Sequence, residues 1–252
     1  VVAIPMDSDG MIPEAIAAVA KSHNVQAICT SPEVHNPTGL FTPVSRREEI
    51  VEVARAHDIQ IIEDDCYRMG ASRAPSYRML APERGWYVSS ISKTLTPALR
   101  IGFVVAPKPS VPALRRSAEH GFFGLATPLA DLAERLLNDP NVAECAAKVN
   151  AVFSQYVQTC VNHLGAYDVT WHKDVPFLWL RLPEGWRASA FCQAAEVERV
   201  QIRPAEEFAG RDARALHAVR IAINAQIDLE HFEAAIMRLR ELLDNPSERI
   251  GV

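Results

Sequence analysis

The chain has 252 residues, enough for one large domain or two smaller ones, and its 48% hydrophobic and 23% charged content is ordinary for a globular protein. Its 26 basic and 31 acidic side chains give a formal net charge of −5, which argues against nucleic acid or an anionic membrane as a partner of this segment. The five cysteines are scattered without metal-ligand or disulfide spacing, and no apolar run approaches the roughly 20 residues of a membrane span. We therefore expect a cytoplasmic protein with reduced thiols and no metal site.

Apolar runs of strand length alternate with helical patterns in the first hundred residues. Strands are expected at 1–5, 25–30, 59–62, 86–90 and 101–106, and helices at 13–20 and 45–57. Ser45 and Glu48 form a capping box for the second helix, and turn-forming residues occupy 7–10. This alternation predicts βαβ units in a mostly parallel sheet. Because the sequence opens directly on a strand, we expect the chain to begin inside a larger fold.

The second half has a different character and predicts a smaller α+β unit. After the prolines at 107, 109 and 112, helical spacing covers 111–119, 127–137, 142–164, 187–195 and 229–243. Short strands are expected at 169–172, 177–182, 200–203 and 218–223, and a frayed polar tail from residue 245.

Lys93 stands out because it is the only lysine between Lys21 and Lys108 and directly follows a predicted strand. Ser90, Ser92 and Arg100 surround it in the sequence. An amine beside hydroxyls and a guanidinium is suited to bind a phosphorylated aldehyde, with the phosphate held by hydrogen bonds and the carbonyl carbon by the amine. A lone loop lysine is otherwise a solvent-exposed residue. Two further polar clusters, at 36–39 and 64–67, follow other predicted strands, where parallel sheets collect ligands.

Four motifs in order carry a family resemblance that runs from Val2 to about Leu243. They are Asn36-Pro37-Thr38-Gly39, Asp64-Asp65-Cys66-Tyr67, Ser90-Ile91-Ser92-Lys93 with Arg100, and Val219-Arg220-Ile221-Ala222. The chain resembles the fold-type I, pyridoxal-phosphate-dependent aminotransferases of class I/II. It is most similar to the branch that aminoadipate-type transaminases share with winged-helix regulators.

The resemblance implies a fold, a cofactor and a set of roles. The fold is the aspartate aminotransferase-like α/β fold, and the cofactor is pyridoxal 5′-phosphate. Lys93 would form the Schiff base and shuttle the proton between the substrate Cα and the cofactor, while Asp64 pairs with the pyridine nitrogen and Tyr67 donates to the phenolate oxygen. The phosphate would be bound by Ser90 and Arg100, with Ser92 as a further contributor. Asn36 would approach the phenolate oxygen and the substrate carboxylate, which Arg220 would grip.

Some alternatives remain open at this point. Asp65 is a rival for the role of Asp64, although the three-residue step to Tyr67 favours Asp64, and Asp65 and Glu63 are interpreted as solvated or capping carboxylates. Arg220 is expected on a strand facing the substrate, or outward if that strand lies at an edge. No chemistry is assigned to Trp179 or Phe208.

The resemblance also implies domain boundaries and a function. We expect the C-terminal portion of a large cofactor-binding domain at 1–107, connecting helices at 108–165 and a small domain at 166–245, with the N-terminal part of the family fold missing. The implied function is amino-group transfer between an amino acid and a 2-oxo acid, in a homodimer. The alternatives are the effector-sensing domain of a winged-helix regulator, or a pyridoxal-phosphate lyase or decarboxylase.

Overall fold

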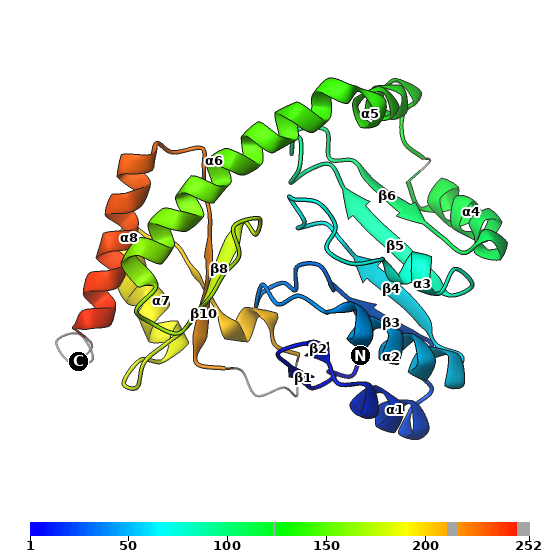
Figure 1. The fold of residues 1–252 in the computed structure, drawn as a ribbon, viewed down its shortest axis with the longest axis horizontal. Helices are drawn as coiled ribbons and strands as arrows, with labels where there is room; N and C mark the ends of the chain where they lie inside the picture. Colours follow the sequence, from blue (N-terminus) through cyan, green and yellow to red (C-terminus); the bar gives the residue numbers. More distant parts are fainter. Residues whose placement is uncertain (123, 211–215, 246–252) are drawn as a thin grey trace. The chain divides into compact units, whose positions relative to one another are not determined.

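The computed structural model describes residues 1–122, 124–210 and 216–245, and the chain forms two compact units (Figure 1). One unit consists of Val1–Ala3, Asn36–Gly39 and Asn150–Val252; we call it the C-terminal unit. The other consists of Ile4–His35 and Leu40–Val149; we call it the N-terminal unit. Each has its own four-stranded sheet and its own hydrophobic core. Residues 36–39 therefore belong with the C-terminal unit, although they follow a strand of the N-terminal unit in the sequence.

The sheet of the N-terminal unit is mostly parallel, as predicted. It contains β3 (Ala27–Thr30), β4 (Gln60–Asp64), β5 (Gly85–Ser90) and β6 (Gly102–Val105), in that order. The first three strands run parallel, and β6 pairs antiparallel with β5. As a result, the C-terminal ends of β4 and β5 and the N-terminal end of β6 meet at one edge of the sheet.

Helices α1 (Pro13–Ser22) and α2 (Val44–Ala56) pack their apolar faces into the core of this unit. Ile16, Ile50 and Ile61 are each at most 2% exposed. Both helices were predicted, but the capping box was not correct. The N–H of Arg47 bonds to the carbonyl of Pro43 at 3.0 Å, so the helix begins at Val44 and Ser45 already lies in its first turn.

Two other local expectations differ from the structure. Residues 1–5 form no strand; a short hairpin of β1 (Met6–Asp7) and β2 (Gly10–Met11) surrounds the predicted turn instead. Pro5 has no N–H to contribute to a ladder, which disfavours a longer strand. A short helix, α3 (Tyr77–Leu80), was not predicted; Ser76 caps it by accepting the N–H of Met79 at 3.3 Å.

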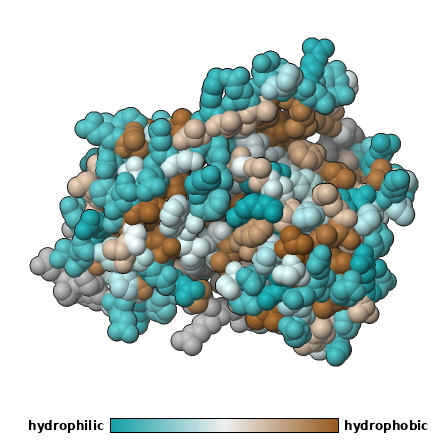
Figure 2. Space-filling model, in the orientation of Figure 1, coloured by the Kyte–Doolittle hydropathy of each residue, from teal (hydrophilic) through white to brown (hydrophobic). Residues whose placement is uncertain are grey.

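The middle of the chain is helical, as predicted. It contains η1 (Lys108–Ser110), α4 (Val111–Phe122), α5 (Thr127–Asn138) and α6 (Pro140–Leu164). Within the described ranges, none of the helices is both long enough and apolar enough to cross a membrane. Exposed apolar side chains include Val104 and Val105 of the edge strand β6, and Figure 2 shows apolar patches interspersed with hydrophilic residues on the drawn face.

The C-terminal unit is an antiparallel sheet packed against helices. Its strands lie in the order β7 (Val169–Thr170), β8 (Phe177–Arg181), β10 (Ala218–Ala222) and β9 (Arg203–Pro204). Helices α7 (Ala188–Val197) and α8 (Leu229–Asp244) and the end of α6 enclose a core that includes Leu180, Phe191 and Leu239, each fully buried. A short 3₁₀ turn, η2 (Ala205–Phe208), follows β9.

The strand expected at 200–203 is shifted and shortened. Arg199 adopts a φ of 61°, and the N–H of Val200 bonds to the carbonyl of Ala195 at 2.8 Å, so these residues end α7 rather than begin a strand. Strand β9 contains only Arg203 and Pro204. Of the tail expected to fray, residues 246–252 lie outside the described part of the chain.

Candidate active site

Strand register brings three sequence-predicted residues to the same edge of the N-terminal sheet. Asp64 is the last residue of β4 and pairs with Val88, two positions before Ser90 at the end of β5. Ser90 pairs with Gly102, the first residue of β6, so Arg100 lies just before that strand. The order of the strands thus brings polar residues that are distant in the sequence together at one edge of the sheet.

Asp64 and Tyr67 lie on the segment that leaves β4. The Asp64 side chain is exposed, and its Oδ1 accepts the N–H of Cys66 at 3.0 Å. Tyr67 is half-buried, and the Nζ atom of Lys93 lies 5.5 Å from the centroid of its ring. The structure therefore brings the predicted amine and the predicted phenol together, from motifs that are separate in the sequence.

Lys93 lies on a loop that is anchored at both ends. The N–H of Ile91 bonds to the carbonyl of Ile101 at 3.3 Å, and Ile91 and Ile101 pack with Ala133 of α5 in a small buried cluster. The Ser90 hydroxyl donates to the same carbonyl at 3.1 Å and accepts the N–H of Ser92 at 3.0 Å. Lys93 itself is exposed on this loop.

Arg100 closes the same loop in an unusual conformation. Its φ is 52°, in the left-handed region that is uncommon for residues other than glycine, and its side chain is exposed. Non-glycine residues are held in this region only when their surroundings determine it, often at ligand sites. Ser90, Ser92, Lys93 and Arg100 thus lie on one loop, which carries two hydroxyls, an amine and a guanidinium.

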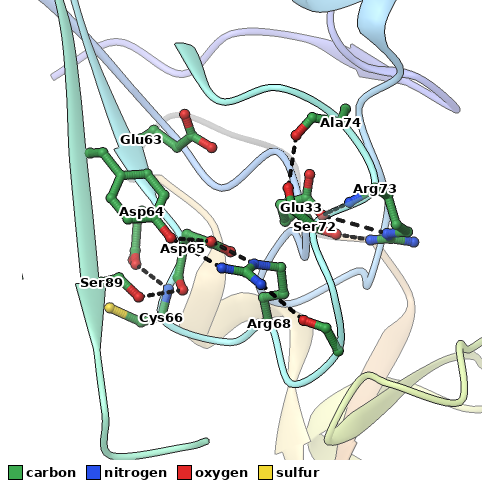
Figure 3. A network of polar contacts seen from close by, with 12 residues as sticks. Glu33, Glu63, Asp64, Asp65, Cys66, Arg68, Ser72, Arg73, Ala74 and Ser89 are labelled. Carbon is green, nitrogen blue, oxygen red and sulfur yellow. Dashed lines mark hydrogen bonds and ion pairs between the residues drawn. The ribbon is translucent and has the colours of Figure 1, made fainter. Parts of the chain in front are cut away.

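Asp65 is buried, which corrects its interpretation as a solvated or capping carboxylate. Figure 3 shows Asp65 and Arg68 pointing toward each other. Its Oδ2 accepts the Tyr87 hydroxyl at 2.5 Å and the Nε of Arg68 at 2.7 Å. The Ser89 hydroxyl donates to its carbonyl at 3.0 Å. Consecutive residues of an extended chain point to opposite sides, so Asp65 faces the interior because Asp64 faces out.

Glu63 is also buried, so the solvated alternative is wrong for it, whereas its bond to the first N–H of α3 agrees with the capping alternative. It is 1% exposed, and its Oε2 accepts the N–H of Tyr77, the first residue of α3, at 2.6 Å. Arg47 lies 3.9 Å away but makes its shorter ion pair, of 2.6 Å, with Glu33. Burial is the main reason that the pKa of Glu63 rises to about 7, because the carboxyl loses hydration that Arg47 does not fully replace.

The two sequence-predicted residues of the C-terminal unit contact each other directly. Nη1 of Arg220 donates to Oδ1 of Asn36 at 2.6 Å. The guanidinium also lies over the rings of Phe177 and Phe208, 5.1 Å from each centroid. Strand β10 lies between β8 and β9, so the edge-strand alternative for Arg220 is wrong.

The Arg220 side chain has one hydrogen-bond donor that is not satisfied within the described part of the chain. Its Nε is buried, and no hydrogen-bond partner for it lies among residues 1–122, 124–210 and 216–245. A buried N–H without a partner is costly, and a carboxylate would satisfy it. Gly39, at the other end of the Asn36 loop, has a φ of 73° that permits the turn.

Sequence reasoning missed several residues of these networks. Arg68, Tyr87 and Ser89 anchor the segment with Asp64 and Tyr67, and Phe177 and Phe208 frame Arg220. One signal was present: alternation along β5 places Tyr87 and Ser89 on the same face. The aromatic frame around Arg220 could not be inferred, because it depends on the pairing of β8 with β10 and on the turn after β9.

The donor set of each unit fits one part of pyridoxal phosphate and its substrate. In the N-terminal unit, one edge of the sheet holds an exposed carboxylate, a phenol, an amine, and the hydroxyls and guanidinium of one loop. These groups match a protonated ring nitrogen, a phenolate, a carbonyl carbon and a phosphate. In the C-terminal unit, the orphaned Nε of Arg220 matches a carboxylate.

Comparison with known proteins agrees with this chemistry. Residues 9–239 match the model of the family described as "Aminotransferase class I and II". The "Uncharacterized HTH-type transcriptional regulator YdeF" of Bacillus subtilis is 26% identical over 97% of this chain and 53% of its own length. The 2-aminoadipate transaminase of Thermus thermophilus is 28% identical over 81% of this chain and 54% of its own length.

Solved structures give the same fold. LysN, the α-aminoadipate aminotransferase of Thermus thermophilus, was crystallised with N-(5′-phosphopyridoxyl)-L-leucine; it aligns with a TM-score of 0.82 at 24% identity, over 97% of this chain and 65% of its own. The chain spans about half the length of the curated relatives above. Because the family model covers most of the sequence, this chain belongs to the class I and II aminotransferase family.

Proposed function

We propose that this chain carries the catalytic lysine, ring-nitrogen partner and carboxylate-binding arginine of a pyridoxal-phosphate-dependent aminotransferase. The observation that carries the proposal is the proximity of Lys93 to Tyr67 at the sheet edge that also holds Asp64, Ser90 and Arg100. The enzyme would move an amino group between an amino acid and a 2-oxo acid. When bound, pyridoxal phosphate supplies the electron sink that makes the Cα–H of an amino acid acidic.

The residues of the N-terminal unit would hold the cofactor. Asp64 would accept the hydrogen bond of the protonated ring nitrogen, and its exposed carboxylate leaves room for that partner. Tyr67 would donate to the phenolate oxygen. Arg100 and Ser92 would donate to the phosphate; Ser90 would join them only if its hydroxyl turned away from the carbonyl of Ile101. Lys93 would bind the carbonyl carbon with loss of water until the nitrogen of the amino acid displaces it, and the freed amine would then carry the proton between the substrate Cα and the cofactor C4′.

The residues of the C-terminal unit would hold the substrate carboxylate. Arg220 would offer its unsatisfied Nε and a terminal nitrogen as a two-pronged donor. Asn36 accepts from Nη1 and so orients the guanidinium plane, while its own amide remains a donor for the same carboxylate. The rings of Phe177 and Phe208 stack on the guanidinium and limit its rotation.

We propose the C-terminal portion of a large cofactor domain at 1–107, connecting helices at 108–165, a small domain at 166–245, and a cytoplasmic homodimer. The similarity to the aminoadipate transaminase supports an amino acid and a 2-oxo acid as substrates. The dimer is proposed from the family alone.

A second candidate is the effector-sensing domain of a transcription regulator, which the similarity to YdeF over 97% of the chain favours. Both candidates use the same cofactor contacts but differ in the fate of the bound amino acid. An enzyme would turn over amino acids, whereas a sensing domain would bind them without sustained transfer to an added 2-oxo acid.

The test begins with the purified protein and added pyridoxal phosphate. Borohydride reduction followed by peptide mass spectrometry should place the cofactor covalently on Lys93, and Lys93→Ala should abolish both the adduct and the visible absorbance band. Lys108→Ala, at an exposed lysine of the same unit, is the matched control and should leave both unchanged. Adduct formation and turnover retained in Lys93→Ala would refute the assignment.

A further inference from the structure

The segment that carries Asp64 and Tyr67 is fixed from beneath by a buried network. Asp65, between them, donates its N–H to the carbonyl of Val88 at 2.8 Å and accepts the Ser89 hydroxyl at its own carbonyl at 3.0 Å. These two bonds attach the backbone of residue 65 to β5, one strand away. The direction of the Asp64 side chain is therefore tied to the position of β5.

A second set of bonds closes the segment on itself (Figure 3). Arg68 reaches back three residues to Oδ2 of Asp65 at 2.7 Å and forward to the carbonyl of Gly70 at 2.9 Å. Its Nη2 donates to the Tyr87 hydroxyl at 3.2 Å, and that hydroxyl donates to the same Oδ2 at 2.5 Å. Because Tyr67 lies between Asp65 and Arg68, this closed ring of contacts restricts the backbone that aims its phenol.

The charges in this network balance. Burial, and then the Asp65 carboxylate, raise the pKa of Tyr87, so the phenol keeps its proton and acts as a donor. Burial opposes the charge on Arg68, but the hydrogen bond and the charge of Asp65 raise its pKa overall. One carboxylate thus faces one guanidinium and one neutral hydroxyl. An isolated Asp65 carboxylate, with its side chain 2% exposed, would be strongly disfavoured.

We propose that Asp65, Arg68 and Tyr87 are positioning residues that set the directions of Asp64 and Tyr67 toward the cofactor. This inference rests on the proposed function, since it assigns the network to the same site. In this proposal the triad is assigned no contact with the cofactor. It acts by fixing the segment 64–68, as rigid support beneath a site keeps its contacting groups in productive geometry.

The decisive variant is Tyr87→Phe, which removes one hydroxyl and keeps the ring. We expect the dissociation constant for pyridoxal phosphate, measured by the absorbance of the bound cofactor, to rise about tenfold, the change that corresponds to about 1.4 kcal/mol. The pH at which that absorbance changes should also shift, because Tyr67 would contact the phenolate oxygen less well. Asp65→Asn should give a larger effect, since it leaves Arg68 without its charge partner.

A matched control lies next to Tyr87 on the same strand. Trp86 donates to Oε1 of Gln60 at 2.9 Å and points to the opposite face of β5, so Trp86→Phe also removes one cross-strand hydrogen bond. A general loss of stability would affect both variants alike. A positioning role predicts that only Tyr87→Phe changes cofactor affinity and the pH profile of the absorbance.

Hydrogen exchange in the cofactor-free protein tests the positioning itself. Tyr87→Phe should accelerate exchange of the backbone amides of residues 65–68, whereas Trp86→Phe should leave them at the wild-type rate. If wild type binds the cofactor on Lys93 and Tyr87→Phe matches it in affinity, pH profile and exchange, the inference fails and the proposed function stands. If wild type forms no adduct on Lys93, the proposed function fails, and the inference with it.

Discussion

Glu63→Gln should change how the stability of the protein depends on pH. The carboxyl of Glu63 is 1% exposed, and its pKa rises from an ordinary 4.5 to about 7, chiefly through burial. Between these two values the unfolded chain is ionised at residue 63 while the folded protein keeps the proton. Unfolding therefore releases a proton, and the free energy of unfolding falls as pH rises.

The expected size comes from the two pKa values. Each pH unit between 4.5 and about 7 is worth about 1.4 kcal/mol, so ionisation costs the folded wild type about 3 kcal/mol by pH 8. Glutamine has nearly the same shape and keeps an oxygen for the N–H of Tyr77, but it does not ionise. The stability of Glu63→Gln relative to wild type should thus increase by about 2.5 kcal/mol between pH 5 and pH 8.

Urea denaturation at a series of pH values measures this difference. Subtraction of the two curves removes the titration of groups that do not interact with Glu63, whereas the charges of Glu33 and Asp65, which raise the pKa of Glu63, act within the difference itself. Glu48→Gln, at an exposed position of α2, should give a difference that does not vary with pH. A flat difference for Glu63→Gln as well, or one that falls as pH rises, would show that Arg47 compensates the carboxylate more fully than its 3.9 Å separation suggests.

Three further changes test other parts of the structure. In steady-state kinetics, Arg220→Gln should raise KM for the amino acid roughly 10- to 100-fold, because a charge-assisted hydrogen bond worth about 1.5–3 kcal/mol is lost. Arg203→Gln, at the neighbouring exposed position of β9, is the control and should leave KM unchanged. Gly39→Ala should lower the free energy of unfolding, measured by urea denaturation, by about 1–2 kcal/mol, because alanine is strained at a φ of 73°. The nearest side-chain atom, on Val175, would lie 3.9 Å from the added methyl group, so steric clash does not contribute. A neutral result would therefore contradict the explanation by backbone strain. Phe191→Ala should cost about 3–5 kcal/mol in the same assay, because it empties a fully buried position against Trp186, and a loss below 1 kcal/mol would mean that the core closes over the cavity.

The sequence was sufficient for elements whose signal is local. Periodicity located most helices and the strands of the N-terminal sheet to within a few residues, and the alternation of strands and helices gave the parallel arrangement of β3, β4 and β5. The candidate site was accessible for the same reason. Lys93, Asp64 and Tyr67 were identified by residue type and spacing within short motifs, and such motifs can be recognised without knowledge of tertiary contacts.

The sequence failed where a residue's environment depends on distant partners. Asp65 was interpreted as solvated because its partner Tyr87 lies 22 residues away on another strand. Arg220 could have faced outward because its partner Asn36 is separated by 184 residues. The errors at Ser45 and at β9 have a different origin, because both elements were predicted correctly but their ends were not. Helix α2 is capped at Pro43 rather than at Ser45, and the left-handed conformation of Arg199 delays the start of β9.

The antiparallel pairing of β6 with β5 constrains how this protein can vary. The connection from Ile91 to Ile101 starts and ends at adjacent points of the same ladder and is tied by a backbone hydrogen bond between those two residues. Substitutions within 92–99 can alter chemistry without moving either end. An insertion or deletion there would instead change the spacing between Lys93 and either Ser90 or Arg100. We therefore expect relatives that retain the lysine to keep the length of this connection while its composition changes.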